Sequence, residues 1–202
     1  MIAAGPAFTS APLWYLTRAS AILGFVLLTL SFALGLASTR RALTRIGWPR
    51  FATQELHRNL SLLAVTFIFL HIVTAITDTY VHVGWWALVV PFVSGYRRLW
   101  VGLGTLAFDA VLAVVATSLI RDRLPQPVWR TIHWTMYLAW PLVFVHFLET
   151  GTDSAHGRWG LYLDLASLLL LLLASTVRWL VKDIPETAPR RSHGAIAGHG
   201  TR

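Results

Sequence analysis

The sequence contains no cysteine, and acidic residues are scarce among its 202 residues. Without a thiol the chain cannot form a disulfide, attach a c-type haem, or bind an iron–sulfur cluster through thiolates. Only 9 aspartates and glutamates stand against 17 lysines and arginines, which gives a formal net charge of +8. The arginines lie in short connections between apolar runs and form no basic patch interleaved with polar residues, so we expect no nucleic-acid partner. Any redox chemistry must use a bound cofactor.

Long apolar runs make up most of the sequence. Hydrophobic residues make up 55% of the chain, charged residues 13%, and the mean hydropathy is +0.59. Such a composition is typical of an integral membrane protein, whose helices need about 20 apolar residues to cross the bilayer. Runs of this length lie at residues 14–38, 56–77, 99–119, 128–148 and 160–181. The sequence therefore predicts an all-α, polytopic membrane bundle of five transmembrane helices.

The remaining segments are short. We expect residues 1–13 to form an extracytoplasmic segment, 14–182 the membrane domain, and 183–202 a polar, disordered cytoplasmic tail. The N-terminus lacks the basic region of a cleaved secretory signal, so the first apolar run should remain in a multi-pass protein of the plasma (inner) membrane. The apolar segment 85–92, WWALVVPF, is too short to span and is predicted to lie at the outer interface.

The basic residues predict the orientation of the helices. Twelve lysines and arginines lie in the connections 39–58 and 120–130 and in the tail, whereas the N-terminal end and the other connections carry four. Short loops rich in lysine and arginine stay in the cytoplasm. The N-terminus is therefore predicted outside and the C-terminus in the cytoplasm.

Four of the eight histidines fall within predicted spans, in two pairs. His57 and His71 are fourteen residues apart, and His133 and His146 are thirteen apart. At ~1.5 Å per residue, these spacings separate the two levels by about 20 Å on each helix. Both helices run from the inside outward, so His57 and His133 share the cytoplasmic level and His71 and His146 the outer level.

Two histidine levels imply two cofactors. A b-type haem is held without a covalent bond, so a six-coordinate iron needs an imidazole on each face, supplied by two helices at one depth. We therefore predict two haems b, with iron bound by His57 and His133 in one and by His71 and His146 in the other. Thirteen residues of ideal helix would turn His133 and His146 about 220° apart, so a deformation is expected near Pro141.

The histidine spacing and the segments ELHRNLSLLAV, GWWALVVPF, TSLIR and WRTIHWTMYLAWPLVFVH resemble the ferric reductase-like transmembrane domain. That family includes NADPH oxidases, ferric reductases and the haem subunit of bacterial methionine sulfoxide reductase, and this chain is similar to its small bacterial branch over about residues 14–181. The resemblance implies b-type haem binding by the two histidine pairs and electron transfer across the membrane. No separate catalytic residue is implied.

The larger relatives carry a flavin and nicotinamide domain after the last helix, whereas about twenty polar residues follow it here. The expected role is thus an oxidoreductase component of cytochrome b type without its own flavin domain. Its partners would be the lipid bilayer, a cytoplasmic flavin or quinone-type electron donor, and an extracytoplasmic electron acceptor or flavin-binding protein.

Three alternatives remain open from the sequence. The chain could be the haem-binding membrane anchor subunit of an extracytoplasmic oxidoreductase that uses flavin or molybdenum. It could be a proton or metal transporter that uses the membrane histidines and Asp109. It could also be a purely structural membrane anchor.

Several charged residues are candidates for subsidiary roles. Arg18 lies near the outer end of the first span and could contact an outer haem propionate or pair with Asp164. Asp109 lies in the middle of the third span and is expected to be buried or hydrogen-bonded. The weaker propionate candidates, for which a surface charge that sets topology is the simpler interpretation, are Arg58, Arg97, Arg98 and Arg130. The histidines expected in loops or the tail are His82, His156, His193 and His199, and either of the first two could touch a substrate or metal.

Overall fold

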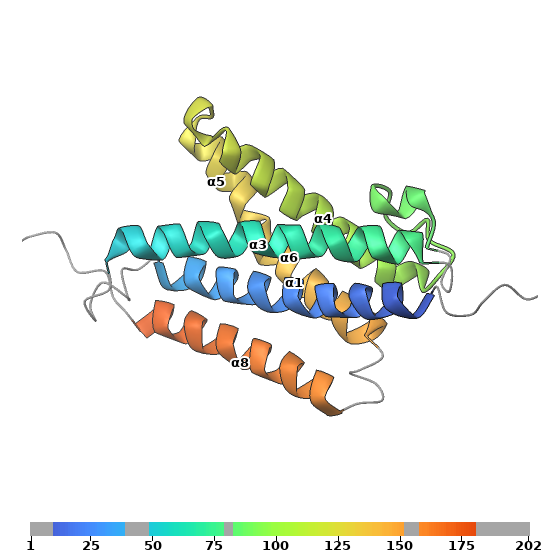
Figure 1. Cartoon of the computed structure of the whole chain (residues 1–202). Helices are drawn as coiled ribbons and strands as arrows, with labels where there is room; N and C mark the ends of the chain where they lie inside the picture. Colours follow the sequence, from blue (N-terminus) through green and yellow to red (C-terminus); the bar gives the residue numbers. More distant parts are fainter. Residues whose placement is uncertain (1–9, 39–48, 79–82, 152–157, 181–202) are drawn as a thin grey trace, which may run out of the picture.

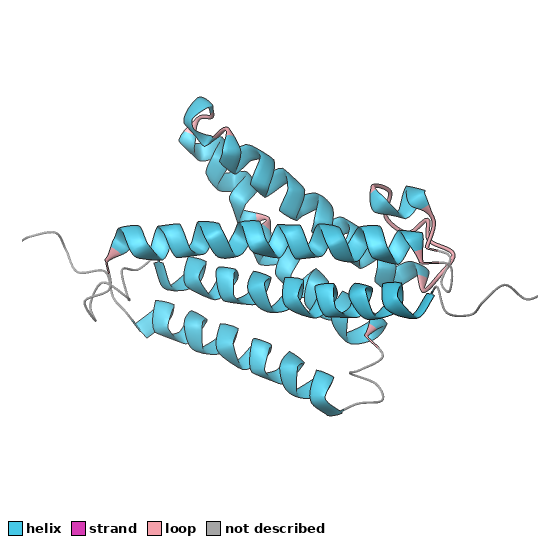
Figure 2. Ribbon diagram, viewed as in Figure 1, coloured by secondary structure: helices cyan, strands magenta, loops and turns pink. Residues whose placement is uncertain are grey.

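The computed structural model describes residues 10–38, 49–78, 83–151 and 158–180, which form only helices and their connections (Figures 1 and 2). The α-helices are α1 (Ser10–Ser38), α3 (Arg50–Thr77), α4 (Arg98–Leu119), α5 (Gln126–Trp134), α6 (Met136–Thr150) and α8 (Arg158–Leu180). Two short 3₁₀ helices, η1 (Trp85–Leu88) and η2 (Arg121–Arg123), lie between them. The all-α class predicted from the sequence is confirmed for these residues.

Four of the described helices are long and apolar enough to cross a membrane, namely α1, α3, α4 and α8. The fourth predicted span, 128–148, is divided between α5 and α6, each of which is shorter than a full crossing. Together these two helices lead back toward the end of the bundle at which α4 begins (Figure 1). A fifth crossing made of α5 and α6 stays a prediction, as does the orientation of the chain in the membrane.

The expected deformation between His133 and His146 lies at Thr135, six residues before Pro141. The backbone N–H of Thr135 donates to the Ile132 carbonyl, and that of Leu138 to the Thr135 carbonyl, both at 3.0 Å. Such i→i−3 bonds wind the chain more tightly than an α-helix. Pro141 lies inside the continuous helix α6, close after this break, where the turn that its ring would disturb is already irregular.

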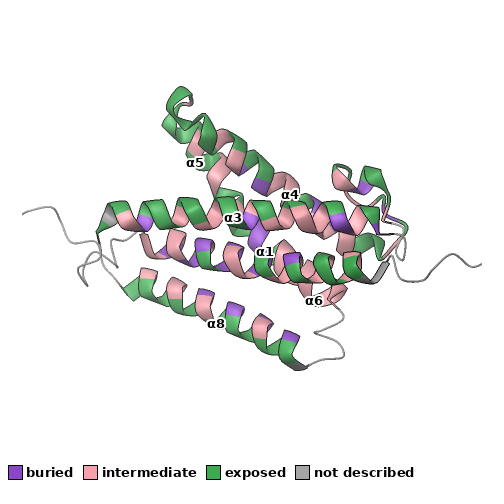
Figure 3. Ribbon diagram, in the orientation of Figure 1, coloured by how far each residue is buried: buried purple, intermediate pink, exposed green. Residues whose placement is uncertain are grey.

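Helix α1 lies at the centre of the bundle and packs along α3, with α8 and α6 on its other sides (Figure 1). The close approach to α3 depends on small side chains: Ala64 is fully buried, and a Cβ added to Gly24 would lie 3.0 Å from Ile68 Cγ1. In a membrane, small residues let helices approach and gain van der Waals contact. Exposed residues lie along the helices (Figure 3), and many of them are large and apolar, as lipid contact requires.

The core around α1 combines aromatic and aliphatic side chains with one buried polar link to α6. Phe25 and Trp140 are buried, and their rings stack with centroids 6.4 Å apart. The Trp140 indole Nε1–H donates to Thr29 Oγ1 at 3.0 Å, while the Thr29 hydroxyl donates to the Phe25 carbonyl at 2.8 Å. The hydrogen bond thus fixes the rotation of α6 relative to α1.

We expect Trp140→Phe, which keeps an aromatic ring and removes the N–H donor, to lower the free energy of unfolding. The coupling between Trp140 and Thr29 should be about 0.6 kcal/mol, the average for interhelical hydrogen bonds in a membrane protein. Unfolding in mixed detergent micelles of wild type, Trp140→Phe, Thr29→Val and the double variant measures it. A coupling energy of zero would contradict this assignment.

Helices α4 and α6 form a second packed pair, and η1 packs on α4 through the Thr105 hydroxyl, which donates to the Ala87 carbonyl at 2.7 Å. By contrast, α3 has only peripheral contacts with α4, α5 and α6 among the described residues. The bundle therefore consists of α1, α3 and α8 on one side and α4, α5 and α6 on the other, linked mainly through α1 and α6. The four predicted histidine ligands lie on α3, α5 and α6.

Candidate functional site

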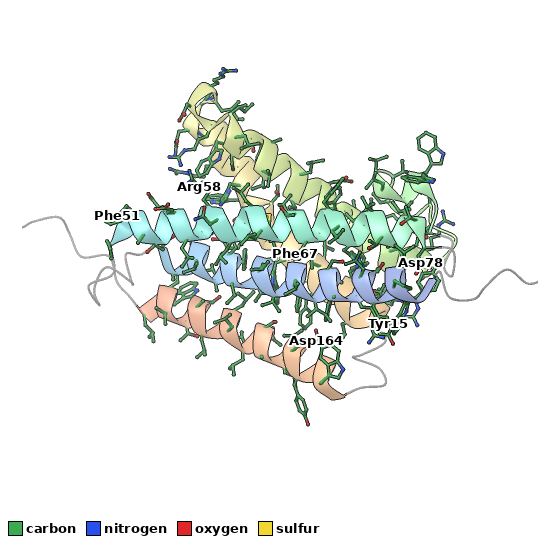
Figure 4. All side chains as sticks on the ribbon, in the orientation of Figure 1. Tyr15, Phe51, Arg58, Phe67, Asp78 and Asp164 are labelled. Atoms are coloured by element: carbon green, nitrogen blue, oxygen red, sulfur yellow. The ribbon has the colours of Figure 1, made fainter. Side chains whose placement is uncertain are left out.

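The structure brings the four membrane histidines together in the two predicted pairs. The rings of His71 on α3 and His146 on α6 have centroids 6.3 Å apart and planes inclined by 69°. Those of His57 on α3 and His133 on α5 are also 6.3 Å apart, inclined by 67°. Figure 4 shows Arg58, next to His57, and Asp78, seven residues after His71, toward opposite ends of α3. The two pairs therefore lie at two levels of the bundle.

The separation within each pair suits two ligands of a single metal ion. A metal ion lies about 2 Å from an imidazole nitrogen, which itself lies about 1.1 Å from its ring centre. Two imidazoles that bind one ion from opposite sides therefore have ring centres about 6.2 Å apart. The observed 6.3 Å in both pairs agrees with this value.

Hydrogen bonds fix the outer pair in the tautomer that binds metal. His71 Nδ1–H donates to the Thr17 carbonyl at 3.0 Å, and His146 Nδ1–H donates to the Trp100 carbonyl at 2.8 Å. A carbonyl oxygen can only accept, so Nδ1 carries a proton in both rings, and in the neutral imidazole Nε2 then exposes its lone pair. Metal-binding histidines are commonly oriented in this way.

His57 of the inner pair has the same tautomer with more partners. Its Nδ1–H faces the Ser31 carbonyl at 2.9 Å and the Ser31 hydroxyl at 3.1 Å. The Ser31 hydroxyl lies 2.6 Å from the Ser61 hydroxyl, which in turn donates to the His57 carbonyl at 2.8 Å. His57 is thereby tied to α1 and to its own helix.

His133 is held differently from the other three ligands. Its Nδ1 is buried and has no hydrogen-bond partner among the described residues. Its ring instead stacks on Trp129, with centroids 5.0 Å apart and planes inclined by 24°. The Arg121 guanidinium lies 4.7 Å from the centre of the Trp129 ring. Stacking and a nearby cation therefore take the place of a hydrogen bond at this ligand.

Two glycines leave room for the ligands. A Cβ on Gly104 of α4 would lie 2.6 Å from His146 Nδ1, far inside van der Waals contact. A Cβ on Gly35 of α1 would lie 3.4 Å from His57 Cε1, an ordinary contact. Only at residue 104 is the absence of a side chain required for the imidazole to occupy its position.

A cavity of about 280 Å³ opens at the outer level, with His71 and His146 in its wall. Most of the wall is apolar and comes from α1, α3, α4 and α6. The polar side chains in the wall include Arg18, Asp78 and Tyr96. The Arg18 guanidinium lies 4.1 Å from the centre of the Trp14 ring. Arg18 thus lines the cavity at which its propionate role was predicted, and that role and the alternative pairing with Asp164 both stay predictions.

The other predicted arginines are at the surface. Arg97 donates to the Glu149 carbonyl and Arg98 to the Phe92 carbonyl, which anchors the connection before α4. Arg58 and Arg130 are exposed. None of these four lines the outer cavity.

Asp109 departs from its expected burial. The residue is half-buried, and it forms no hydrogen bond or ion pair within the described ranges. The reason is that α4 packs mainly on α6 and η1, which leaves part of its circumference uncovered. The remaining histidines, His82, His156, His193 and His199, lie outside the described residues, as does the predicted tail.

Sequence reasoning missed the groups that orient the ligands. The Thr17 and Trp100 carbonyls belong to the main chain. Every residue has such a carbonyl, so residue type does not indicate which ones accept from the ligands. Ser31, Ser61 and Gly104 offered a weak signal, because polar or small residues within a membrane span often lie at helix contacts.

Within the described part of the chain, no group of three or more His, Asp or Glu side chains could hold a metal ion. Each site offers two protein ligands, the number that an iron already held by a porphyrin takes.

Comparison with known protein families gives one match. The family model of the ferric reductase-like transmembrane component matches residues 20–144, more than half of the sequence. The matched range includes His57, His71 and His133, and it ends two residues before His146. No curated protein and no solved structure matches the chain.

Proposed function

The chain belongs to the ferric reductase-like transmembrane family and is a multi-pass membrane protein, and we propose that it transfers electrons across the membrane through two bis-histidine haems b. Membership of the family supports transmembrane electron transfer in general. The observation that carries the finer proposal is the repeated 6.3 Å separation of paired imidazoles at two levels.

In this proposal the protein side chains bind the two haems and orient them. His57 and His133 hold the inner group, while His71 and His146 hold the outer one. When bound, each haem takes up a single electron and passes it on, and an iron with two histidine ligands has no open position for oxygen or substrate. The apolar wall of the outer cavity excludes water and lowers the local dielectric constant, and Arg18 offers a cation for an anionic propionate.

The direction of transfer follows from the proposed orientation. Arg58, Arg121, Arg123 and Arg130 lie at the His57 and His133 end, which supports a cytoplasmic position for it. Electrons would enter there from a flavin or quinone-type donor and leave near His71 and His146 to an extracytoplasmic acceptor. The chain would then supply the transmembrane part of a redox system.

Electron transfer into sealed vesicles tests the proposal. The protein is reconstituted into liposomes that contain ferricyanide, and dithionite is added outside. Wild type should reduce the trapped ferricyanide, and His133→Ala should slow this by about 100-fold or more, since loss of even an outer-shell partner of a metal ligand costs 10–100-fold.

The matched control is His199→Ala, in the predicted tail outside the described residues, which should transfer electrons like wild type. A wild-type rate equal to that of empty liposomes would contradict the proposal. Bound divalent metal without haem absorption would instead favour the histidine-based transporter.

A further inference from the structure

The four ligands differ in what their Nδ1 atoms contact, and the difference divides the two sites. At the outer level both rings donate to carbonyl oxygens, of Thr17 and Trp100. At the inner level His57 donates to Ser31, whereas His133 Nδ1 is buried without a partner in the described ranges. The two sites are alike in ring separation and unlike in hydrogen bonding.

The contacts of His57 form a closed loop in which every donor has an acceptor. The imidazole Nδ1–H is shared between the carbonyl and hydroxyl oxygens of Ser31, at 2.9 and 3.1 Å. The Ser31 hydroxyl then donates to Ser61 Oγ at 2.6 Å, because the Ser61 hydrogen is used on the His57 carbonyl at 2.8 Å. In the neutral imidazole this loop leaves Nε2 without a proton, and Nε2 is then the atom available to iron.

We propose that Ser31 and Ser61 are positioning residues that strengthen His57 as an iron ligand, and that the inner haem nevertheless has the higher midpoint potential of the two. This inference rests on the haem sites proposed above. A hydrogen bond from Nδ1–H makes an imidazole more basic, so it stabilises ferric iron and lowers the potential. The outer iron would have two such ligands and the inner iron one.

Charged side chains lie near both levels. Arg121 lies over the Trp129 ring that stacks on His133, and the exposed Arg58 and Arg130 lie at the same end of the bundle. Positive charge near a haem favours the reduced form, which carries one positive charge less. Because Arg18 and Asp78 also line the outer cavity, charge does not separate the two levels. The difference in ligand strength is what raises the potential of the inner haem relative to the outer one.

A redox titration followed by absorption, on purified holoprotein, tests the inference. Wild type should titrate in two one-electron steps. His71→Ala, which retains only the inner site, should titrate in one step at the higher potential. Ser31→Ala removes the hydroxyl acceptor and keeps the Ser31 carbonyl acceptor, so it should move only the higher step, upward, by at most a factor of about three in the ferric-to-ferrous ratio, the effect of one average interhelical hydrogen bond. This factor corresponds to about 30 mV at 59 mV per tenfold change.

Three companion variants separate positioning from folding. Ser31→Thr keeps the hydroxyl and should titrate like wild type. Ser61→Ala removes the acceptor of the Ser31 hydroxyl and should move the same step in the same direction. Ser38→Ala, a serine of α1 that donates only to the Gly35 carbonyl, should move neither step. If Ser31→Ala loses haem, Ser61→Ala provides the same measurement.

The inference is overturned if the serine variants leave both steps unmoved, if they move the lower step, or if His71→Ala titrates at the lower potential. A wild type with fewer than two haems per chain would instead overturn the proposed function, and the haem-to-protein ratio distinguishes this result.

Discussion

Substitution of His71 by alanine is expected to remove the outer haem, leave the inner haem bound, and stop electron transfer across the membrane. The rings of His71 and His146 form a pair at the outer level, and the His71 imidazole is already oriented by the Thr17 carbonyl. A methyl group cannot replace a ligand, so the iron would keep His146 alone. We expect the haem-to-protein ratio to fall from two to one and transfer into vesicles to fall by about 100-fold or more.

The inner pair provides the reciprocal comparison. His57→Ala should also reduce the ratio to one, and the haem that remains should have the spectrum lost in His71→Ala. The double variant should contain no haem. If His71→Ala retained two haems with unchanged spectra, as a purely structural anchor predicts, the assignment of His71 would be wrong.

Gly104→Ala is expected to have the second large effect, although it adds only one methyl group. The new Cβ would lie 2.6 Å from His146 Nδ1 and 2.7 Å from Cε1, so the imidazole must move. Movement breaks the hydrogen bond to the Trp100 carbonyl and changes the distance to His71. Because loss of such a partner costs about 10–100-fold in metal affinity, the outer haem should be largely lost on purification.

Gly35→Ala is the matched control. It places the same methyl group 3.4 Å from His57 Cε1, within ordinary contact, and should retain both haems. Both changes replace a glycine inside a helix by the best helix former, worth about 1 kcal/mol of helix propensity, so loss of helix cannot explain a defect at residue 104 alone. Equal haem contents in the two variants would contradict the steric argument.

Four of the five apolar runs in the sequence correspond to single helices, α1, α3, α4 and α8, whereas the run 128–148 is divided between α5 and α6. The sequence also predicted which histidines lie close together, because both predictions depend on length and depth. The apolar run 99–119 corresponds closely to α4 (Arg98–Leu119). Helix α3 begins at Arg50, six residues before the expected Leu56, since its first turns are polar and project beyond the apolar run. Assigning two histidines to the same level required only the number of residues between the histidines on each helix, which the helical rise converts to depth.

The direction in which each histidine points from its helix could not be predicted from the number of residues between histidines. Facing His133 and His146 toward α3 depends on the break at Thr135, which lies six residues before Pro141 and is formed by local i→i−3 hydrogen bonds. The tautomers depend on main-chain carbonyls of α1 and α4, and the fit of His146 depends on Gly104. These features depend on which distant segments of the chain pack together, and a single sequence does not show this directly.

The haem content of the purified wild-type protein tests the central claim most directly. Haem b is extracted and quantified against protein determined by amino-acid analysis, and the spin state of the iron is read from electron paramagnetic resonance of the oxidised protein. Two pairs of imidazoles at 6.3 Å predict two haems b per chain, both six-coordinate and low-spin. A ratio of one or less, or high-spin iron in the wild type, would contradict the account.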